Sequence, residues 1–227
     1  SEGHILWDAY HHPRDRGWDS DALGAADVSD RERAYIYRAV KMFAGGAFSR
    51  APRFIDKTAE NCLRIPYLLE LFPDARFVFL RREAAGNVNS LIEAWRARPR
   101  FVKYRLPETL DGLGELSGDR WSFALVPGWR ELRQAPLEEI CARQYVACNE
   151  AALDAFAGID PARRIDVSYG EMVGEPVETA RRLYDGLGLE LSPEIERYAA
   201  ALADTPSSTA LTAPSPEKWR RQNPEAI

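Results

Sequence analysis

Cysteine is scarce in this chain of 227 residues, and its three copies form no paired pattern. Cys62, Cys141 and Cys148 all fall in segments that we expect to be helical, and none belongs to a Cys-x-x-Cys pair. Disulfide-rich scaffolds and zinc sites need more cysteines or a closer spacing, so the sequence argues against both. We expect reduced thiols, no bound metal and a reducing, cytoplasmic compartment.

Long apolar runs are absent as well. No segment approaches the roughly 20 apolar residues that a membrane helix needs, and the polar and aromatic first residues do not resemble a signal peptide. The net charge of −5 does not favour binding to nucleic acid or to an anionic membrane. With 45% hydrophobic and 29% charged residues, the chain is expected to form one soluble domain over residues 1–227.

The chain is organised around two successive strand-to-helix passages. The first begins with a short apolar segment at residues 54–56, which is interrupted by Lys57 and Thr58 before a helical segment that reaches Leu71. Pro66 lies inside that segment, so the helix begins late or bends there.

The second passage begins with an uninterrupted apolar run at residues 77–80. Such a run is typical of a strand buried on both faces of a parallel sheet. Arg81 and Arg82 end the strand, and apolar residues at helical spacing predict a helix up to Trp95.

Four polar side chains lie where these strands end. Ligands of open α/β sheets bind outside the carboxyl ends of the strands, and helix N-termini there favour anions. Arg82 and Ser90 are eight residues apart, a helical rise of roughly 9 Å that an extended arginine can close. We therefore expect Lys57, Thr58, Arg82 and Ser90 to converge on one anionic ligand.

Three strings in this region carry a family resemblance. They are Asp56 to Asn61 (D-K-T-A-E-N), Leu71 to Phe77 (L-F-P-D-A-R-F), and the Arg82–Ser90 pair. The series resembles the core of the PAPS-dependent sulfotransferases, particularly their bacterial and tyrosylprotein-sulfotransferase-like branch. Those proteins read D-K-T-P-E-N, L-F-P-D-A-R-F and an R-D-P turn with a serine eight residues after the arginine. Alanines replace the two prolines here, which removes no ligand group.

The resemblance implies an α/β fold in which a mainly parallel sheet is flanked by helices, of the P-loop nucleotide-binding kind. It also implies PAPS as donor, PAP as product, and a hydroxyl or amine acceptor on a small molecule or a carrier. Lys57 corresponds to the lysine that meets the sulfuryl group, and Arg82 and Ser90 to the residues that hold the 3′-phosphate. The family's first strand, phosphate loop and helix are absent from this chain. Either the chain is part of a longer protein, which we favour, or half of the nucleotide site has been lost.

The general base has several candidates near the beginning of the chain. Glu2 best matches the place of the catalytic glutamate in the tyrosylprotein branch, where a carboxylate accepts the acceptor's proton. His4, His11 and His12 are rival bases in the same segment. A surface or helix-capping role for Glu2, and a pocket-wall role for the histidines, remain alternatives.

Residues 97–136 combine basic and aromatic side chains with several glycines. We expect a loop-rich lid over the acceptor, because long irregular insertions in compact domains are usually functional. Basic residues among aromatics can also bind RNA, which the acidic net charge disfavours. Candidate acceptor contacts, all of which could instead fill a core, are Trp7, His11, His12, Trp95 and Trp129.

The last third of the chain holds further cofactor candidates. A helix is predicted from Leu137 to Phe156, followed by a strand at residues 164–169. The resemblance implies that Tyr169, at the end of this strand, contacts adenine. Residues 205–216 are expected to be mobile. Lys218 and Arg220 resemble the basic segment that relatives bring back to the 3′-phosphate, although a solvated role is an alternative.

Two other classes of function stay open. A non-catalytic sulfotransferase-like binding module would keep the fold without the reaction. A P-loop small-molecule kinase would need carboxylates that bind Mg²⁺, and Asp56 is the one well-placed candidate. No pattern identifies the acceptor or the oligomeric state.

Overall fold

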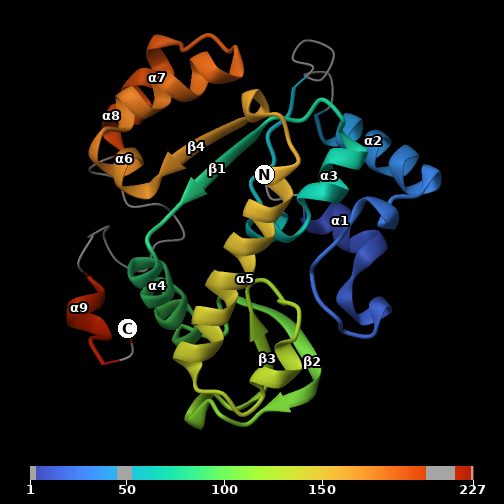
Figure 1. Ribbon diagram of the computed structural model, residues 1–227, viewed down its shortest axis with the longest axis vertical. Coiled ribbons are helices and arrows are strands. Elements are labelled where there is room, and N and C mark those ends of the chain that lie inside the picture. Colours follow the sequence, from blue (N-terminus) through green and yellow to red (C-terminus); the bar gives the residue numbers. More distant parts are fainter. Residues whose placement is uncertain (1–3, 45–52, 203–217, 226) are drawn as a thin grey trace. The chain divides into compact units, whose positions relative to one another are not determined.

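The computed structural model describes residues 4–44, 53–202, 218–225 and 227, and Figure 1 shows their secondary structure. Glu2 and the segment 205–216, which was expected to be mobile, lie outside the described residues. The chain divides into two compact units. The first unit comprises residues 1–75, 102–136 and 146–155, and the second comprises residues 76–101, 137–145 and 156–227.

Three helices build the core of the first unit: α1 (His4–His11), α2 (Asp30–Ala44) and α3 (Ile65–Leu71). Pro66 lies in the first turn of α3, where its missing N–H costs nothing, which confirms the expected late start. The buried cluster between the helices consists of Trp7, Leu23, Ile36, Val40, Tyr67, Leu68 and Leu71.

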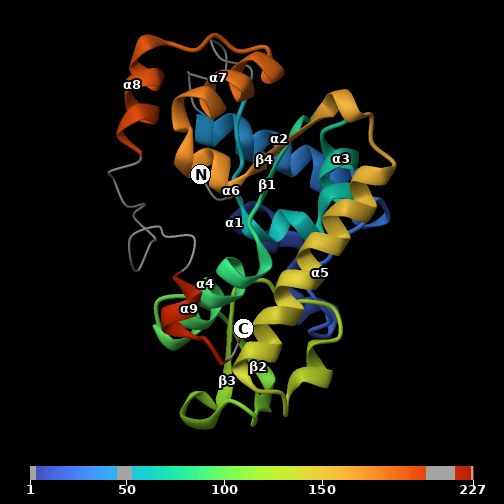
Figure 2. The ribbon, with the colours of Figure 1, turned by 60° about the vertical axis from the view of Figure 1, so that its left-hand side comes forward.

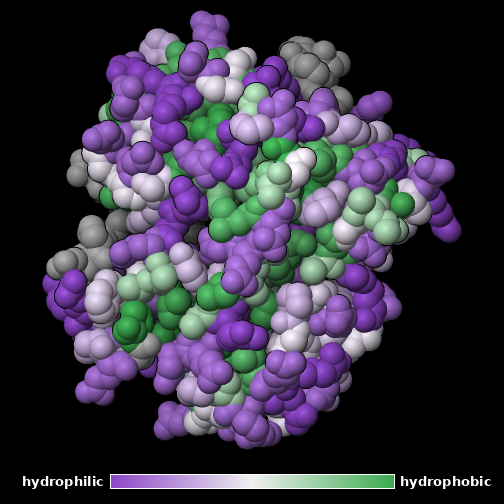
Figure 3. Space-filling model, in the orientation of Figure 1, coloured by the Kyte–Doolittle hydropathy of each residue, from purple (hydrophilic) through white to green (hydrophobic). Residues whose placement is uncertain are grey.

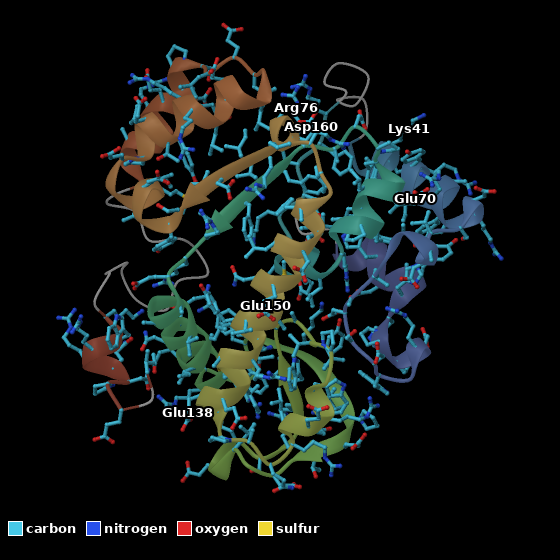
Figure 4. The ribbon with its side chains drawn as sticks, viewed as in Figure 1. Lys41, Glu70, Arg76, Glu138, Glu150 and Asp160 are labelled. Atoms are coloured by element: carbon cyan, nitrogen blue, oxygen red, sulfur yellow. The ribbon has the colours of Figure 1, made fainter. Side chains whose placement is uncertain are left out.

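Local polar contacts fix the ends of these helices. Ser29 Oγ accepts a hydrogen bond from the Glu32 N–H at 3.3 Å, so Ser29 caps α2. Arg33 ties α2 to α3 through a 2.6 Å hydrogen bond to Glu70, which is labelled in Figure 4.

A β-hairpin lies within the segment that we expected to be loop-rich, and the sequence analysis did not predict its two strands. β2 (Val102–Leu110) and β3 (Gly118–Ser122) pair antiparallel, with Val102 opposite Ser122 and Leu110 opposite Gly118. Tyr104 and Leu106 lie two residues apart in β2 and both face the interior, as a half-buried strand requires. A lid function for this segment stays a prediction.

The second unit is built on a parallel sheet, which confirms the predicted α/β fold. β1 (Phe77–Arg81) pairs in parallel with β4 (Arg164–Ser168), with Arg81 opposite Ser168. Figures 1 and 2 show the helices that accompany this pair. They are α4 (Ala84–Arg96), α6 (Tyr169–Gly174), α7 (Pro176–Leu187), α8 (Pro193–Ala201) and α9 (Trp219–Gln222). The long helix α5 (Leu137–Ala157) contributes residues to both units.

Two details of the predicted strands need correction. Phe77 and Phe79 pack on the ring of Phe156, but Val78 and Leu80 are 45% and 46% exposed, so β1 is not buried on both faces. Residues 54–56 form no strand, because two apolar residues are too few to hold a pairing and Asp56 bonds to the turn after them.

The face shown in Figure 3 is covered mostly by polar and charged side chains, with smaller hydrophobic patches between them. Among the described helices, none is long and apolar enough to cross a membrane.

Candidate anion-binding site

Arg82, Ser90 and Tyr169 meet at the carboxyl edge of the parallel sheet. Because Arg81 and Ser168 are paired neighbours, the residues that follow them, Arg82 and Tyr169, leave the sheet side by side. Arg82 Nη1 donates a hydrogen bond to Ser90 Oγ at 2.9 Å. Its guanidinium carbon lies 4.6 Å from the centre of the Tyr169 ring, a cation–π geometry. The structure thus brings together three residues that the sequence proposed for one ligand.

The backbone around Arg82 keeps this side chain in place. Tyr145 of α5 donates its hydroxyl to the Arg82 carbonyl oxygen at 3.1 Å. A Cβ at Gly86 would lie 3.2 Å from Arg82 Nε, so the absent side chain gives the guanidinium room against α4. Arg81, the neighbouring arginine at the end of β1, instead lies 3.7 Å from Asp166 with its side chain 53% exposed.

Lys218 adds a second cation to this group. Burial lowers its pKa below the ordinary value of 10.5, and the positive charge of Arg82 lowers it further, against a smaller opposing effect of Glu93. Within the described residues, neither Lys218 nor Arg82 forms an ion pair with a carboxylate. Two cations without a paired acid, beside a hydroxyl and an aromatic ring, form a suitable site for a phosphate group.

The short helix α9 is attached to α4 by buried amides that the sequence analysis missed. Asn223 Nδ2 donates to Asn89 Oδ1 at 2.7 Å, and Arg96 Nη1 donates to Asn223 Oδ1 at 2.7 Å. Asn89 is 1% exposed and Asn223 is 6% exposed. The available signal was an asparagine beside Val88 on the apolar face of the predicted helix. Arg220, also proposed for the cofactor, is exposed and lies over the ring of Trp219.

The turn around Lys57 belongs to the first unit. Asp56 accepts hydrogen bonds from Thr58 Oγ1 at 2.9 Å and from Asn61 Nδ2 at 2.6 Å. The hydroxyl hydrogen of Thr58 is therefore committed to Asp56, and Thr58 is buried. Lys57 stands exposed on this rigid turn. Since Lys57 and Arg82 lie in different units, their joint action on one ligand stays a proposal.

The sequence model of the Sulfotransferase family matches residues 7–193, which is most of the chain. The chain belongs to the sulfotransferase family. Among its relatives is the omega-hydroxy-beta-dihydromenaquinone-9 sulfotransferase Stf3 of Mycobacterium tuberculosis, 29% identical over 161 residues. That match covers 69% of this chain and 35% of the relative.

Carbohydrate sulfotransferase 2 of Homo sapiens is 34% identical over 70 residues, which are 29% of this chain and 13% of that protein. The crystal structure of sulfotransferase STF9 from Mycobacterium avium superimposes with a TM-score of 0.52 at 22% identity, over 78% of this chain and 38% of that one. This structural likeness concerns the fold. The present sulfotransferase chain spans about a third of the length of Stf3.

Three tryptophans proposed as acceptor contacts in this sulfotransferase lie in the interior instead. Trp7 is 1% exposed, and Trp95 and Trp129 are 0% exposed. Trp95 Nε1 donates to Gln144 at 3.0 Å, and Trp129 Nε1 to the Trp18 carbonyl oxygen at 2.7 Å. Large aromatic rings gain most from burial, so these side chains fill cores rather than line an open surface.

The histidines near the beginning of the chain also have structural partners. His11 Nε2 lies 2.8 Å from the buried carboxylate of Glu32. His12 Nδ1 accepts the Arg14 N–H at 3.1 Å, and the His12 ring meets the edge of Trp18. Either histidine could therefore bind a substrate only while it keeps these contacts. His4 lies at the start of α1.

Proposed function

We propose that this chain takes part in the transfer of a sulfuryl group from PAPS to a hydroxyl or amine of a small-molecule or carrier-bound acceptor. One observation carries the proposal: Arg82 donates to Ser90 Oγ and lies over the ring of Tyr169, its charge contributes to the lowered pKa of Lys218, and neither cation pairs with a carboxylate in the part of the chain that the structure describes. Membership of the sulfotransferase family supports the same reaction class.

The residues of this site fit the nucleotide end of PAPS. Arg82 and Lys218 neutralise the 3′-phosphate, and Ser90 Oγ both orients Arg82 and offers its own hydrogen to a phosphate oxygen. Tyr169, already stacked on Arg82, presents an aromatic surface to adenine. PAPS supplies the activated sulfuryl group, and no metal is needed in this scheme.

The remaining roles concern the transfer itself. The acceptor oxygen or nitrogen bonds to sulfur while the bond from sulfur to the bridging phosphate oxygen breaks, giving the sulfated acceptor and PAP. Lys57 balances the negative charge that grows on that bridging oxygen, in the manner of preorganised electrostatic stabilisation. Glu2 or His4 accepts the proton that the acceptor loses. His11 and His12 are weaker candidates, because one ring nitrogen of each already has a partner.

Calorimetric titration with PAP and a transfer assay with radiolabelled PAPS test the proposal. Arg82→Ala should weaken PAP binding by about tenfold or more, since a charge-assisted contact with phosphate is lost. Arg81→Ala, which removes an exposed neighbouring cation, is the matched control and should leave affinity nearly unchanged. Equal PAP affinity for Arg82→Ala and the unaltered protein would overturn the site assignment.

The transfer assay separates the enzyme from the binding-module alternative. Phenolic, sugar, lipid and carrier-bound hydroxyl compounds are offered as acceptors. Tight PAP binding without transfer to any of them favours a non-catalytic module. Binding of ATP with Mg²⁺ in preference to PAP would favour the kinase alternative. The two oxygens of Asp56 already accept hydrogen bonds from the chain, which weighs against that kinase.

A further inference from the structure

Two adjacent residues of helix α4 contact two different groups of side chains. Ser90 contacts Arg82, whereas Asn89, the residue before it, contacts α9. Glu93 and Arg96 follow Asn89 at intervals of four and three, so these three side chains lie on one face of the helix. Figures 1 and 2 both show α9 alongside α4. A shift of α9 along this face would therefore displace Asn89, which directly precedes Ser90 of the anion site.

Asn223 is the centre of the contact between the two helices. Its Nδ2 donates to Asn89 Oδ1 at 2.7 Å and to Glu93 Oε1 at 3.2 Å, while its Oδ1 accepts from Arg96 at 2.7 Å. Asn89 in turn donates to Gln222 at 3.0 Å. Buried amides with nearly all their hydrogen bonds made fix one geometry, because any displacement leaves polar groups unpaired.

Beyond these hydrogen bonds, little stabilises helix α9. The helix comprises only four residues, and isolated helices of this length do not persist in water. Lys218, directly before it, is brought near the like charge of Arg82, which by itself opposes docking. The hydrogen bonds of Asn223 therefore have to offset a repulsion that a bound anion would remove.

From these contacts we infer that Asn223 is a positioning residue. Through Asn89, Glu93 and Arg96 it holds α9, and with it Lys218, against α4, and it thereby sets the affinity for the 3′-phosphate of the nucleotide. The inference rests on the proposed function, because it assigns the ligand group that Lys218 meets. Its consequence is a coupling between two sites: a 3′-phosphate strengthens the docking of α9, and docked α9 strengthens the binding of the 3′-phosphate.

A double-mutant cycle on PAP affinity tests this role. The variants are Asn223→Ala, Lys218→Ala and the double variant, each titrated with PAP and with 5′-AMP, which lacks the 3′-phosphate. We expect Asn223→Ala to weaken PAP binding by about tenfold, to have little further effect once Lys218 is replaced, and to leave 5′-AMP binding unchanged. Arg221→Ala, an exposed cation of the same helix, is the control and should keep full affinity.

Two further measurements protect the test against a general loss of structure. Gln222→Ala removes one exposed partner of Asn89 and should weaken PAP binding in the same direction by a smaller factor. Hydrogen exchange of residues 218–225 should slow when PAP is added to the unaltered protein, and slow less in Asn223→Ala.

The outcomes are distinct. Additive losses in the cycle, or equal losses for PAP and 5′-AMP, mean that Asn223 is merely structural and overturn the inference while PAP binding itself stands. No PAP binding by the unaltered protein overturns the proposed function, and the inference falls with it.

Discussion

Arg82 donates a hydrogen bond to Ser90 Oγ, 2.9 Å away and eight residues later in the chain. The contact uses one of five guanidinium N–H groups, and in the described part of the chain no other acceptor takes the rest. With Tyr169 against the guanidinium plane, the side chain is oriented before any ligand arrives. Such preorganisation lowers the entropy lost on binding, so changes that move Arg82 should weaken PAP binding without unfolding the protein.

Gly86→Ala tests whether the position of Arg82 matters. The new methyl group would lie 2.9 Å from Glu83 Oε1, 3.2 Å from Arg82 Nε and 3.4 Å from Arg82 Nη2, so the Glu83 carboxylate must move and the guanidinium must shift, which stretches its contacts with Ser90 and Tyr169. We expect PAP affinity to fall about three- to tenfold. Stability should hold or rise, since alanine favours a helix over glycine by about 1 kcal/mol. Calorimetry and urea unfolding measure the two effects. Gly174→Ala, where the added Cβ meets nothing, should change neither strongly; equal affinity for Gly86→Ala and the unaltered protein would contradict the prediction.

Lys57→Ala should separate turnover from binding. Lys57 stands on the turn that Asp56 shapes, and we assign its charge to the bridging oxygen that becomes negative only as the sulfuryl group leaves. We expect turnover to fall about 10²–10³-fold, as for the removal of one electrostatic donor, with PAP affinity nearly unchanged. Steady-state assays and PAP titration measure the two quantities. Lys41→Ala, an exposed lysine of α2 labelled in Figure 4, should retain full turnover. A loss confined to PAP affinity in Lys57→Ala would place Lys57 at the nucleotide instead.

Lys218 should take up a proton when PAP binds at alkaline pH. In the free protein, burial and the charge of Arg82 lower the Lys218 pKa, whereas a bound phosphate raises it again. Between these two pKa values the free lysine is neutral and the bound one is charged, so affinity falls as pH rises through this interval. Calorimetry in two buffers of different ionisation enthalpy measures the uptake. Lys218→Arg should abolish the uptake. An equal uptake in Lys218→Arg would assign the proton to another group.

The thiols should differ in their reaction with alkylating reagents. Cys141 is fully buried, and burial together with the charge of Glu138 (Figure 4) raises its pKa. A hydrogen bond with Cys62, and then burial, raise the pKa of Cys148. Because the thiolate is the reactive form, iodoacetamide should label Cys62 before Cys141, which is buried, and before Cys148, which is partly exposed like Cys62 but has the raised pKa. Peptide mass spectrometry at successive times checks this order, and labelling of Cys141 as fast as Cys62 would refute it.

The fold could be predicted where the periodicity was strong and the ends were marked. Helix α5 and strand β4 appear within about one residue of their predicted bounds, because apolar spacing and capping residues act locally. The β2–β3 hairpin was missed, since charged residues and Pro107 conceal its alternation. The proposed strand at residues 54–56 failed because Asp56 bonds to the turn that follows it.

The site could be predicted only where it is local in sequence. Arg82 and Ser90 are linked by helical geometry, so their spacing was sufficient. Asn89 and Asn223 are 134 residues apart, and no local pattern reports such a contact. The burial of the three tryptophans was missed for another reason. Composition shows that large rings are present, but only packing decides whether they line a surface or fill a core.

A buried carboxylate ties the first unit together. Asp21 is 1% exposed, and its oxygens accept hydrogen bonds from Arg64 Nη2 at 2.7 Å, from the Tyr104 hydroxyl at 2.6 Å and from the Leu125 N–H at 2.7 Å. Lys103 lies 3.4 Å away. These partners come from the start of α3, from β2 and from the segment after β3. One side chain therefore joins three parts of the chain that are far apart in sequence.

Asp21→Asn should therefore destabilise the protein strongly. The amide keeps the shape of the carboxylate but turns one acceptor into a donor, and it leaves the fully buried Arg64 with only the longer 3.5 Å contact to the Asp8 carboxylate. Removing one partner of a buried ion pair costs about 3–5 kcal/mol, which urea unfolding would detect as a lower midpoint. The matched control is Asp119→Asn, which breaks an exposed 3.0 Å pair with Arg105 and should cost less than about 1 kcal/mol. Equal losses in the two variants would show that Asp21 contributes no more than a surface charge.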